Sequence, residues 1–245
     1  MSADAIAVRR LHNPEDTALR ELAGLLRATF ADPDTVLELD RMQAFLAEPD
    51  GLLERKFCVV VAEEGGVVLG GTVFSYVLAT NCGFSEYLLV RKERHNQRIG
   101  RLLFDARRAV LDQLARQSGQ TSCGGLFIEA DNPERTPPDL QARERETAMD
   151  ALTRLQVFAH LGFLRVDMEY VQPPLGPGKQ PVSYLDLLFA PWDAHIQKEG
   201  RLPAEWASRT LCAIWESWTP ATASTDCAAL RERLGESPVG LIPLP

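Results

Sequence analysis

A short apolar run, a basic loop and a long helical pattern follow one another from Phe84 to Arg116, and they constrain the fold more than any other feature. The run Glu86–Val90 has the length and the β-formers of a buried strand. The segment RKERHNQRIG that follows is polar and basic and ends in Gly100. Apolar residues then recur at helical spacing, at Leu102, Leu103, Ala106, Ala109, Val110 and Leu114. The expected order is therefore strand, basic loop and helix.

The basic loop is a candidate anion site. Free backbone N–H groups lie at the N-terminus of a helix, where the macrodipole is positive, and basic side chains add to that field. Phosphate is the anion that such a loop would bind. The simpler alternative is a solvated helix entrance made by the loop's basic residues, namely Arg91, Lys92, Arg94, Arg98 and Arg101.

This loop resembles the acyl-CoA pyrophosphate loop of the GNAT superfamily of acetyltransferases. Members carry the pattern Arg/Gln-x-x-Gly-x-Gly/Ala between their fourth strand and third helix. In this chain Gly100 matches the final glycine. His95 stands where Arg or Gln is usual, and Arg98 replaces the first glycine.

A second block farther along the chain resembles the same superfamily. The segment GGLFIEAD, then Asn132, then a helix ending in FAHLGF is similar to the fifth strand, an asparagine and the Tyr-x-x-x-Gly-Phe helix end. Phe158 takes the tyrosine position, while Gly162 and Phe163 match. The two blocks occur in family order, and the resemblance covers about residues 5–190.

The resemblance implies a fold, a co-substrate and a set of binding residues. The fold is α/β, a mixed, mostly antiparallel sheet flanked by helices, here with a helical C-terminal extension. The co-substrate is acetyl-CoA or another acyl-CoA, without a metal. The CoA-binding residues carried over by position are Leu89, Val90, Arg94, His95, Asn96, Gln97, Arg98, Ile99, Gly100, Arg101, Asn132 and Phe158.

Acyl transfer to an amine requires a general base and a proton for the leaving thiolate. Glu129, in the apolar strand LFIEAD, is the first candidate base, because its setting would raise its pKa, and Glu86 is the second. The acid is less defined, since Phe158 has no proton to donate. Tyr170 is the named candidate, with the alternatives Tyr184, His95, His160 and water.

Composition limits the partners. The net charge of −8 argues against a general nucleic-acid role, and no apolar run is long enough to span a bilayer. The N-terminus MSADAIAVRR lacks the apolar core of a signal peptide. Five dispersed cysteines favour reduced thiols over a disulfide framework, so we expect a cytoplasmic protein.

The pattern of the chain changes after about residue 190. We expect residues 1–190 to form an acyl-CoA-binding catalytic domain and residues 191–245 a helical extension. Trp206, Trp215 and Trp218 predict that this extension packs on the first domain or on the partner subunit of a homodimer. Further expectations are a turn at Pro49–Gly51, a long Pro-rich loop over residues 131–143, a strand pair Leu164–Val171 and Val182–Phe189, and a tail from Ser237.

Together these features favour an acyl-CoA-dependent N-acyltransferase, of the acetyltransferase type, that acts by direct attack in a ternary complex. The acceptor would be a small-molecule amine or a peptide amine. Five cysteines without a partnered base give no support to a covalent acyl-enzyme. The rival hypothesis is a non-catalytic acyl-CoA-binding or protein-interaction module, which the substitutions at Arg98 and Phe158 favour.

Overall fold

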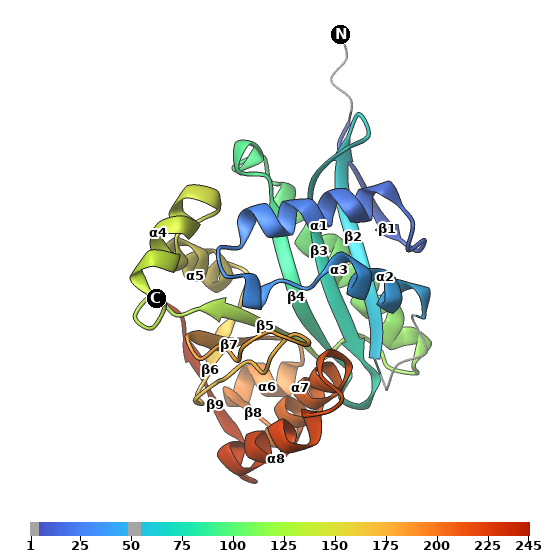
Figure 1. Cartoon of the computed structure of the whole chain (residues 1–245). Helices are drawn as coiled ribbons and strands as arrows, with labels where there is room; N and C mark the ends of the chain where they lie inside the picture. The colour runs from blue at the N-terminus through green and yellow to red at the C-terminus, as the bar shows by residue number, and fades with distance from the viewer. Residues whose placement is uncertain (1–4, 49–54) are drawn as a thin grey trace.

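The computed structural model describes residues 5–48 and 55–245, and within them the chain forms one nine-stranded sheet (Figure 1). The predicted turn Pro49–Gly51 lies outside these residues. The strand order is β1-β2-β3-β4-β5-β7-β6-β9-β8. The strands are β1 Ala7–Leu11, β2 Arg55–Glu64, β3 Val67–Val77, β4 Cys82–Val90, β5 Gly125–Asp131, β6 Leu164–Val166, β7 Leu185–Pro191, β8 Arg201–Leu202 and β9 Val239–Pro243.

Neighbouring strands run antiparallel, except that β4 and β5 are parallel. A parallel pair needs a crossover connection, and the helix after the basic loop supplies it. The sheet is therefore mixed and mostly antiparallel, which confirms the predicted fold class. The helices are α1 Thr17–Thr29, α2 Leu39–Ala47, α3 Ile99–Gln117, α4 Pro138–Thr147, α5 Ala151–His160, α6 Ala194–Glu199, α7 Ala204–Trp218 and α8 Ala223–Leu234.

Helices cover both faces of the sheet. In Figure 1, α1 and α2 lie in front of β2–β4, and α3 lies behind them. The amphipathic α1 buries Leu19, Leu22 and Leu26 on this front face, in one apolar cluster with Tyr87. The helix α3 buries Leu103 and Leu111 in a second cluster on the opposite face. The sheet thus has a core on each side.

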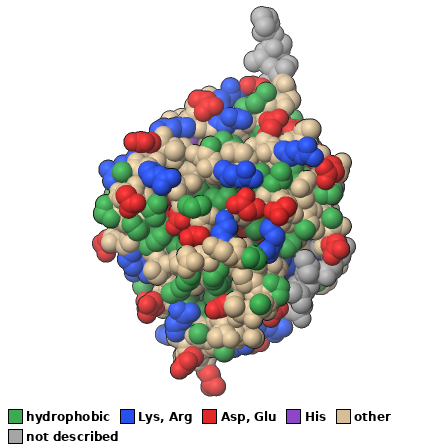
Figure 2. Space-filling model, in the orientation of Figure 1, with side chains coloured by type: hydrophobic (Ala, Val, Ile, Leu, Met, Phe, Trp, Pro, Cys, Tyr) green, Lys and Arg blue, Asp and Glu red, His purple; other side chains and the backbone are tan. Residues whose placement is uncertain are grey.

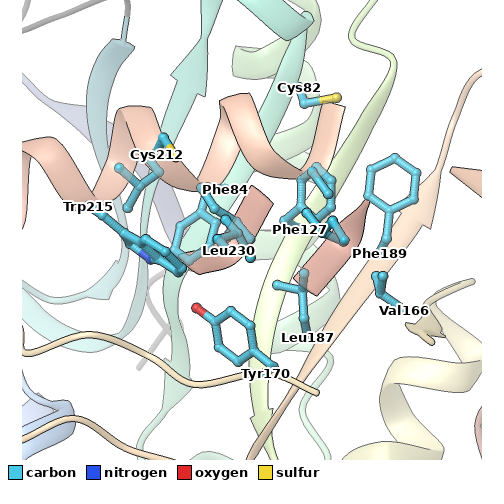
Figure 3. Packing of buried hydrophobic residues seen from close by; sticks show 14 of the residues in the cluster. Cys82, Phe84, Phe127, Val166, Tyr170, Leu187, Phe189, Cys212, Trp215 and Leu230 are labelled. Atoms are coloured by element: carbon cyan, nitrogen blue, oxygen red, sulfur yellow. The ribbon is translucent and has the colours of Figure 1, made fainter. Parts of the chain in front are cut away.

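The C-terminal segment packs on the rest of the chain through a third apolar cluster. Figure 3 shows Trp215 of α7 beside Phe84 and above Tyr170, with Cys212 on the same helix, and all of them belong to one cluster with Phe127. Trp215 and Trp218 are 1% and 2% exposed, and Trp206 is partly buried against the same cluster. The segment after residue 236, expected to be a tail, is strand β9, and it pairs with β6. The tryptophans are therefore covered within the chain itself.

Two other segments differ from expectation. The Pro-rich stretch 131–143 contains the start of α4, because Pro138 occupies the first turn of the helix, where its missing N–H costs nothing. The strand pair Leu164–Val171 and Val182–Phe189 is shorter than expected. Only β6 and β7 form its ladder, and Gln172 and Val182 make an isolated bridge beyond it.

The expectation of reduced cysteines is wrong for one pair. Cys212 of α7 and Cys227 of α8 form a disulfide, with their Cα atoms 5.6 Å apart. They are 15 residues apart in sequence, and only the packing of the two helices brings them together. Cys58, Cys82 and Cys123 are free and buried.

Basic and acidic side chains are interspersed over the face of the molecule that Figure 2 shows. Within the described ranges, none of the helices combines the length and apolarity needed to cross a membrane. The same residues contain no group of His, Cys, Asp and Glu arranged to hold a metal ion.

Candidate active site

The site lies where the two parallel strands separate. Strands β4 and β5 pair from Cys82 with Gly125 to Ser85 with Ile128, and the pairing then stops. Beyond that point β4 continues along β3, and β5 continues along β7. Figure 1 shows the two strands diverging toward α4 and α5. The next residues after the last pair are Glu86 and Glu129, so both candidate bases stand at the opening of this fork.

A β-bulge orients Glu86. Opposite β3, Val73 pairs with Tyr87 and Phe74 pairs with Ser85, which leaves Glu86 as the extra residue. A bulge breaks the alternation of side chains and re-aims one of them. Glu86 therefore lies on the face covered by α1 and α2, as Tyr87 does.

Glu86 is paired with a buried cation. Its Oε1 accepts a hydrogen bond from Ser75 Oγ at 2.8 Å and forms an ion pair with Arg55 Nη1 at 3.2 Å. The Glu86 side chain is 2% exposed and that of Arg55 is 1% exposed. Burial raises the pKa of Glu86, while Arg55 and Ser75 oppose the rise. Its Oε2 has no hydrogen-bond partner among the described residues.

Glu129 has neutral partners instead. The Tyr170 hydroxyl donates to its Oε1, and Gln172 Nε2 donates to its Oε2 at 2.7 Å. Burial raises the pKa of Glu129 to about 7; the two hydrogen bonds lower it, and the negative charge of Glu86 raises it further. A carboxyl group with this pKa can accept and release a proton near neutral pH.

A cleft of about 620 Å³ runs from the fork to the basic loop. Its walls include the end of β4, the N-terminus of α3 and the inner face of α5. The Arg91 N–H donates to the Leu69 carbonyl of β3, so the peptide groups of Arg91 face β3. In an antiparallel ladder the peptide groups of successive residues point to opposite sides of the strand, so those of Leu88 and Val90 point away from β3 and toward the fork. The Val90 carbonyl there contacts His95 Nε2 at 3.0 Å. The same alternation turns the peptide groups of Leu89, a predicted CoA-binding residue, toward β3. The cleft thus combines a helix N-terminus with a strand edge that is open at the Leu88 peptide groups and the Val90 N–H.

Arg98, in the basic loop, has a backbone conformation that is usual for glycine. Arg98 precedes α3 with φ of 61°, the left-handed conformation that favours glycine. Its exposed guanidinium has no hydrogen-bond or ion-pair partner in the described part of the chain, whereas Arg94 is paired with Glu64 at 2.5 Å. A Cβ on Gly100 would meet only Val90 Cγ2, at 3.8 Å. The packing of neighbouring residues therefore does not require glycine at position 100. Close approach of an anion to the backbone at this position would require it.

The structure gathers most of the predicted residues on the walls of this cleft. They are Glu86, Leu89, Val90, Arg94, His95, Asn96, Arg98, Ile99, Gly100, Glu129 and Phe158. Gln97, Arg101, Asn132 and Tyr170 do not line it.

Three of these four have other positions or partners. Arg101 pairs with Asp105, and Asn132 Nδ2 donates to Asp186. Tyr170 is buried behind Glu129, so it contacts this candidate base and not the cleft. Among the other acids considered, His95 lines the cleft, and Tyr184 lines an adjoining chamber, where its hydroxyl donates to Asp32.

Two site residues were missed. Gln172 precedes the Pro-rich loop of residues 173–181, and no motif marks it; only the fold brings it to Glu129. Arg154 lines the cleft and pairs with Asp131 and Glu144. It lies four residues before Phe158 on the same face of α5, and that spacing was the signal that could have found it.

No protein-family model matches the chain, and no curated protein matches it. Solved structures do. One is an acetyltransferase of the GNAT family from Bacteroides thetaiotaomicron, with a TM-score of 0.49, 15% identity and coverage of 80% of this chain and 93% of the other.

Two others cover a similar share of the chain. The ribosomal-protein-S18-alanine N-acetyltransferase of Escherichia coli matches with a TM-score of 0.48 and 13% identity, over 77% of this chain and 95% of its own. The PaiA N-acetyltransferase of Thermoplasma acidophilum, in complex with coenzyme A, matches with a TM-score of 0.48 and 11% identity, over 77% and 99%. Several matches are described as GNAT proteins, the superfamily that the sequence resembles.

Proposed function

We propose that this chain is an acyl-CoA-dependent N-acyltransferase of the GNAT type, which transfers an acyl group directly to a primary amine. The observation that carries the proposal is the fork itself. A buried glutamate, whose pKa burial raises to about 7, lines the same cleft as the N-terminus of α3 and its unpaired Arg98. A proton acceptor and an anion site thus share one cavity.

The residues of the cleft fit an acyl-CoA. The backbone N–H groups at the start of α3 would hold the pyrophosphate, because Gly100 presents no side chain and Arg98 has a free positive charge. The peptide groups of Leu88 and the N–H of Val90 on the open edge of β4 would bind the pantetheine arm. A bound acyl-CoA supplies a thioester that the amine attacks, so that a C–N bond forms, the C–S bond breaks and CoA leaves as the thiolate.

The residues of the fork supply the proton chemistry. Glu129 takes the proton of the acceptor amine, and Tyr170 and Gln172 hold its two carboxylate oxygens in place. Tyr170 is then a positioning residue and not the acid. Phe158, which is 7% exposed and packs on Phe163, shapes the cleft without donating a proton.

The first experiment is calorimetry with acetyl-CoA on the wild type and Gly100→Glu. Bulk and negative charge next to the pyrophosphate should weaken binding at least tenfold, about 1.4 kcal/mol. Gly24→Glu is the matched control, because Gly24 lies exposed on α1 and a Cβ there would meet no atom within 4 Å. Equal affinity of folded Gly100→Glu and wild type would rule out this CoA site.

An acceptor screen for CoA release then separates catalysis from binding. Release that depends on an added amine supports the transferase. Tight acetyl-CoA binding without release by any amine supports the rival, a non-catalytic acyl-CoA-binding module, which Phe158 at the usual tyrosine position favours.

We also propose the division into a domain of residues 1–190 and an extension of residues 191–245. The burial of Trp215 against Phe84 and Tyr170 supports a structural role for the extension behind the fork.

A further inference from the structure

A small chamber adjoins the cleft at the fork, and its walls are acidic. It has a volume of about 60 Å³, room for roughly four water molecules. Its carboxylates are Glu86, Glu129, Asp131 and Glu144, and Arg154 is the one basic side chain among the described residues that line it. An acidic wall alone does not identify a ligand, so the partners of these groups decide what the chamber can bind.

Two buried acceptor atoms at the chamber have no partner. They are Glu86 Oε2 and Gln172 Oε1, among the residues that the structure describes. Glu86 and Gln172 both line the chamber, and Gln172 is 3% exposed. An unsatisfied buried acceptor costs free energy, and an ammonium group, with three donors and no acceptor, satisfies such atoms. Gln172 contacts Glu129 through its Nε2, and the charge of Glu86 acts on Glu129, which would take the ammonium proton.

The positive charge of Arg154 is already neutralised. Its terminal guanidinium nitrogen Nη1 contacts Asp131, and Nη2 contacts Glu144 at 2.9 Å and donates to Met149 O at 2.8 Å. Two carboxylates thus surround one cation, which leaves no free positive charge for an anionic substituent of a ligand. Arg55 is held likewise by Glu86.

Among the described residues, four aromatic side chains also line the chamber, beside aliphatic ones. Phe30, Tyr87, Tyr184 and Trp218 line the chamber, and aromatic faces attract organic cations. A volume of about 60 Å³ is too small for a peptide chain but accepts a slim aliphatic body.

We infer that the acceptor is a small aliphatic amine whose body is apolar or carries a second ammonium group, and bears neither carboxylate nor phosphate. Its reacting ammonium group is held between Glu86 Oε2 and Gln172 Oε1 beside Glu129. This inference rests on the proposed function for the role of the amine, but the binding of the amine can be tested without turnover.

Three four-carbon probes test the inference: butylamine, 1,4-diaminobutane and 4-aminobutanoate. Each is titrated into the protein with and without CoA and followed by protein NMR. The first two should bind, and 4-aminobutanoate should bind about tenfold more weakly or worse. Equal or tighter binding of 4-aminobutanoate overturns the inference, as does the failure of all three to bind.

Two variants locate the site. Gln172→Met removes one acceptor at nearly constant size and should weaken butylamine about tenfold while CoA affinity is kept; Gln197→Met, whose amide contacts Pro191 O elsewhere, is the matched control. Glu144→Gln removes the charge of one of the two carboxylates that pair with Arg154. It should lower the ratio of butylamine affinity to 4-aminobutanoate affinity about tenfold. Unchanged amine binding in Gln172→Met, or an unchanged preference in Glu144→Gln, contradicts the proposed geometry.

Turnover separates the two proposals. If the amines bind but never release CoA from acetyl-CoA, the transferase function fails and the cation site stands. If CoA is released with 4-aminobutanoate in preference to butylamine, the transferase stands and the inferred substrate class is wrong.

Discussion

The two walls of the fork carry the same side chain in opposite electrostatic settings. On β4, Glu86 is buried against the guanidinium of Arg55. On β5, Glu129 is equally buried but is held by the neutral donors Tyr170 and Gln172. Burial raises the pKa of both carboxyl groups: at Glu86 the positive charge of Arg55 opposes the rise, whereas at Glu129 only neutral donors oppose it and the pKa reaches about 7. The two carboxyl groups therefore differ in the charge of the partner that opposes burial, and not in the direction in which burial shifts the pKa.

The largest expected effect concerns the stability of the β4 wall. Arg55→Leu leaves Glu86 buried without its cation and should lower the free energy of unfolding by about 3–5 kcal/mol. Replacing both residues by leucine removes the uncompensated charge and should recover most of the loss. Urea unfolding of the two variants checks this. A single variant as stable as wild type would mean that Arg55 and Glu86 are not an energetically coupled pair.

The second prediction concerns the pH dependence of stability at the β5 wall. The pKa of Glu129 is raised in the folded state, so its favourable contribution is complete below its ordinary pKa of 4.5 and is lost as pH rises through about 7. At about 1.4 kcal/mol per pKa unit, the wild type should lose about 3 kcal/mol relative to Glu129→Gln across this range. Unfolding measured at about pH 4 and about pH 8 tests the difference. Parallel pH profiles of the two proteins would refute the raised pKa.

The third prediction is the effect of Glu129→Gln on turnover. The variant keeps the shape of the fork but cannot accept a proton, and it should cut kcat about a hundredfold, the usual scale for a general base. Its kcat should also no longer rise with pH through about 7. Acetyl-CoA affinity, measured by calorimetry, should be unchanged.

Glu86 provides the comparison for that experiment. Since Glu86→Gln alone leaves Arg55 without a full counter-charge, the double variant Arg55→Met/Glu86→Gln is the better control. It should raise KM for the amine more than it lowers kcat. If this variant lost kcat and Glu129→Gln kept it, the roles of the two glutamates would be exchanged.

The sequence predicted the strand, loop and helix around Gly100 and the position of Glu129, because these depend on local patterns and a resemblance in order. It did not predict the different settings of the two glutamates. The bulge at Glu86 breaks the period-two alternation that strand patterns rely on. Arg55 is 31 residues away and Gln172 is 43 residues away from their partners, so only the folded sheet brings them together. The Cys212–Cys227 disulfide depends on helix packing for the same reason.

The smallest expected effect is a shift of the pH profile in Tyr170→Phe. The hydroxyl of Tyr170 donates to Glu129, which lowers the pKa of that carboxyl, and no cavity wall is changed by its removal. A hydrogen bond to a charged group is worth about 1.5 kcal/mol, so the pKa of Glu129 should rise by about one unit. The acid limb of kcat should move to higher pH by the same amount, while the rate at high pH stays near that of wild type. Tyr76→Phe is the matched control, because its buried hydroxyl donates to Asn81 at 2.9 Å, outside the cleft and the chamber. A Tyr170→Phe variant with an unshifted profile but a lower rate at every pH would instead assign Tyr170 to proton donation, as the sequence first indicated.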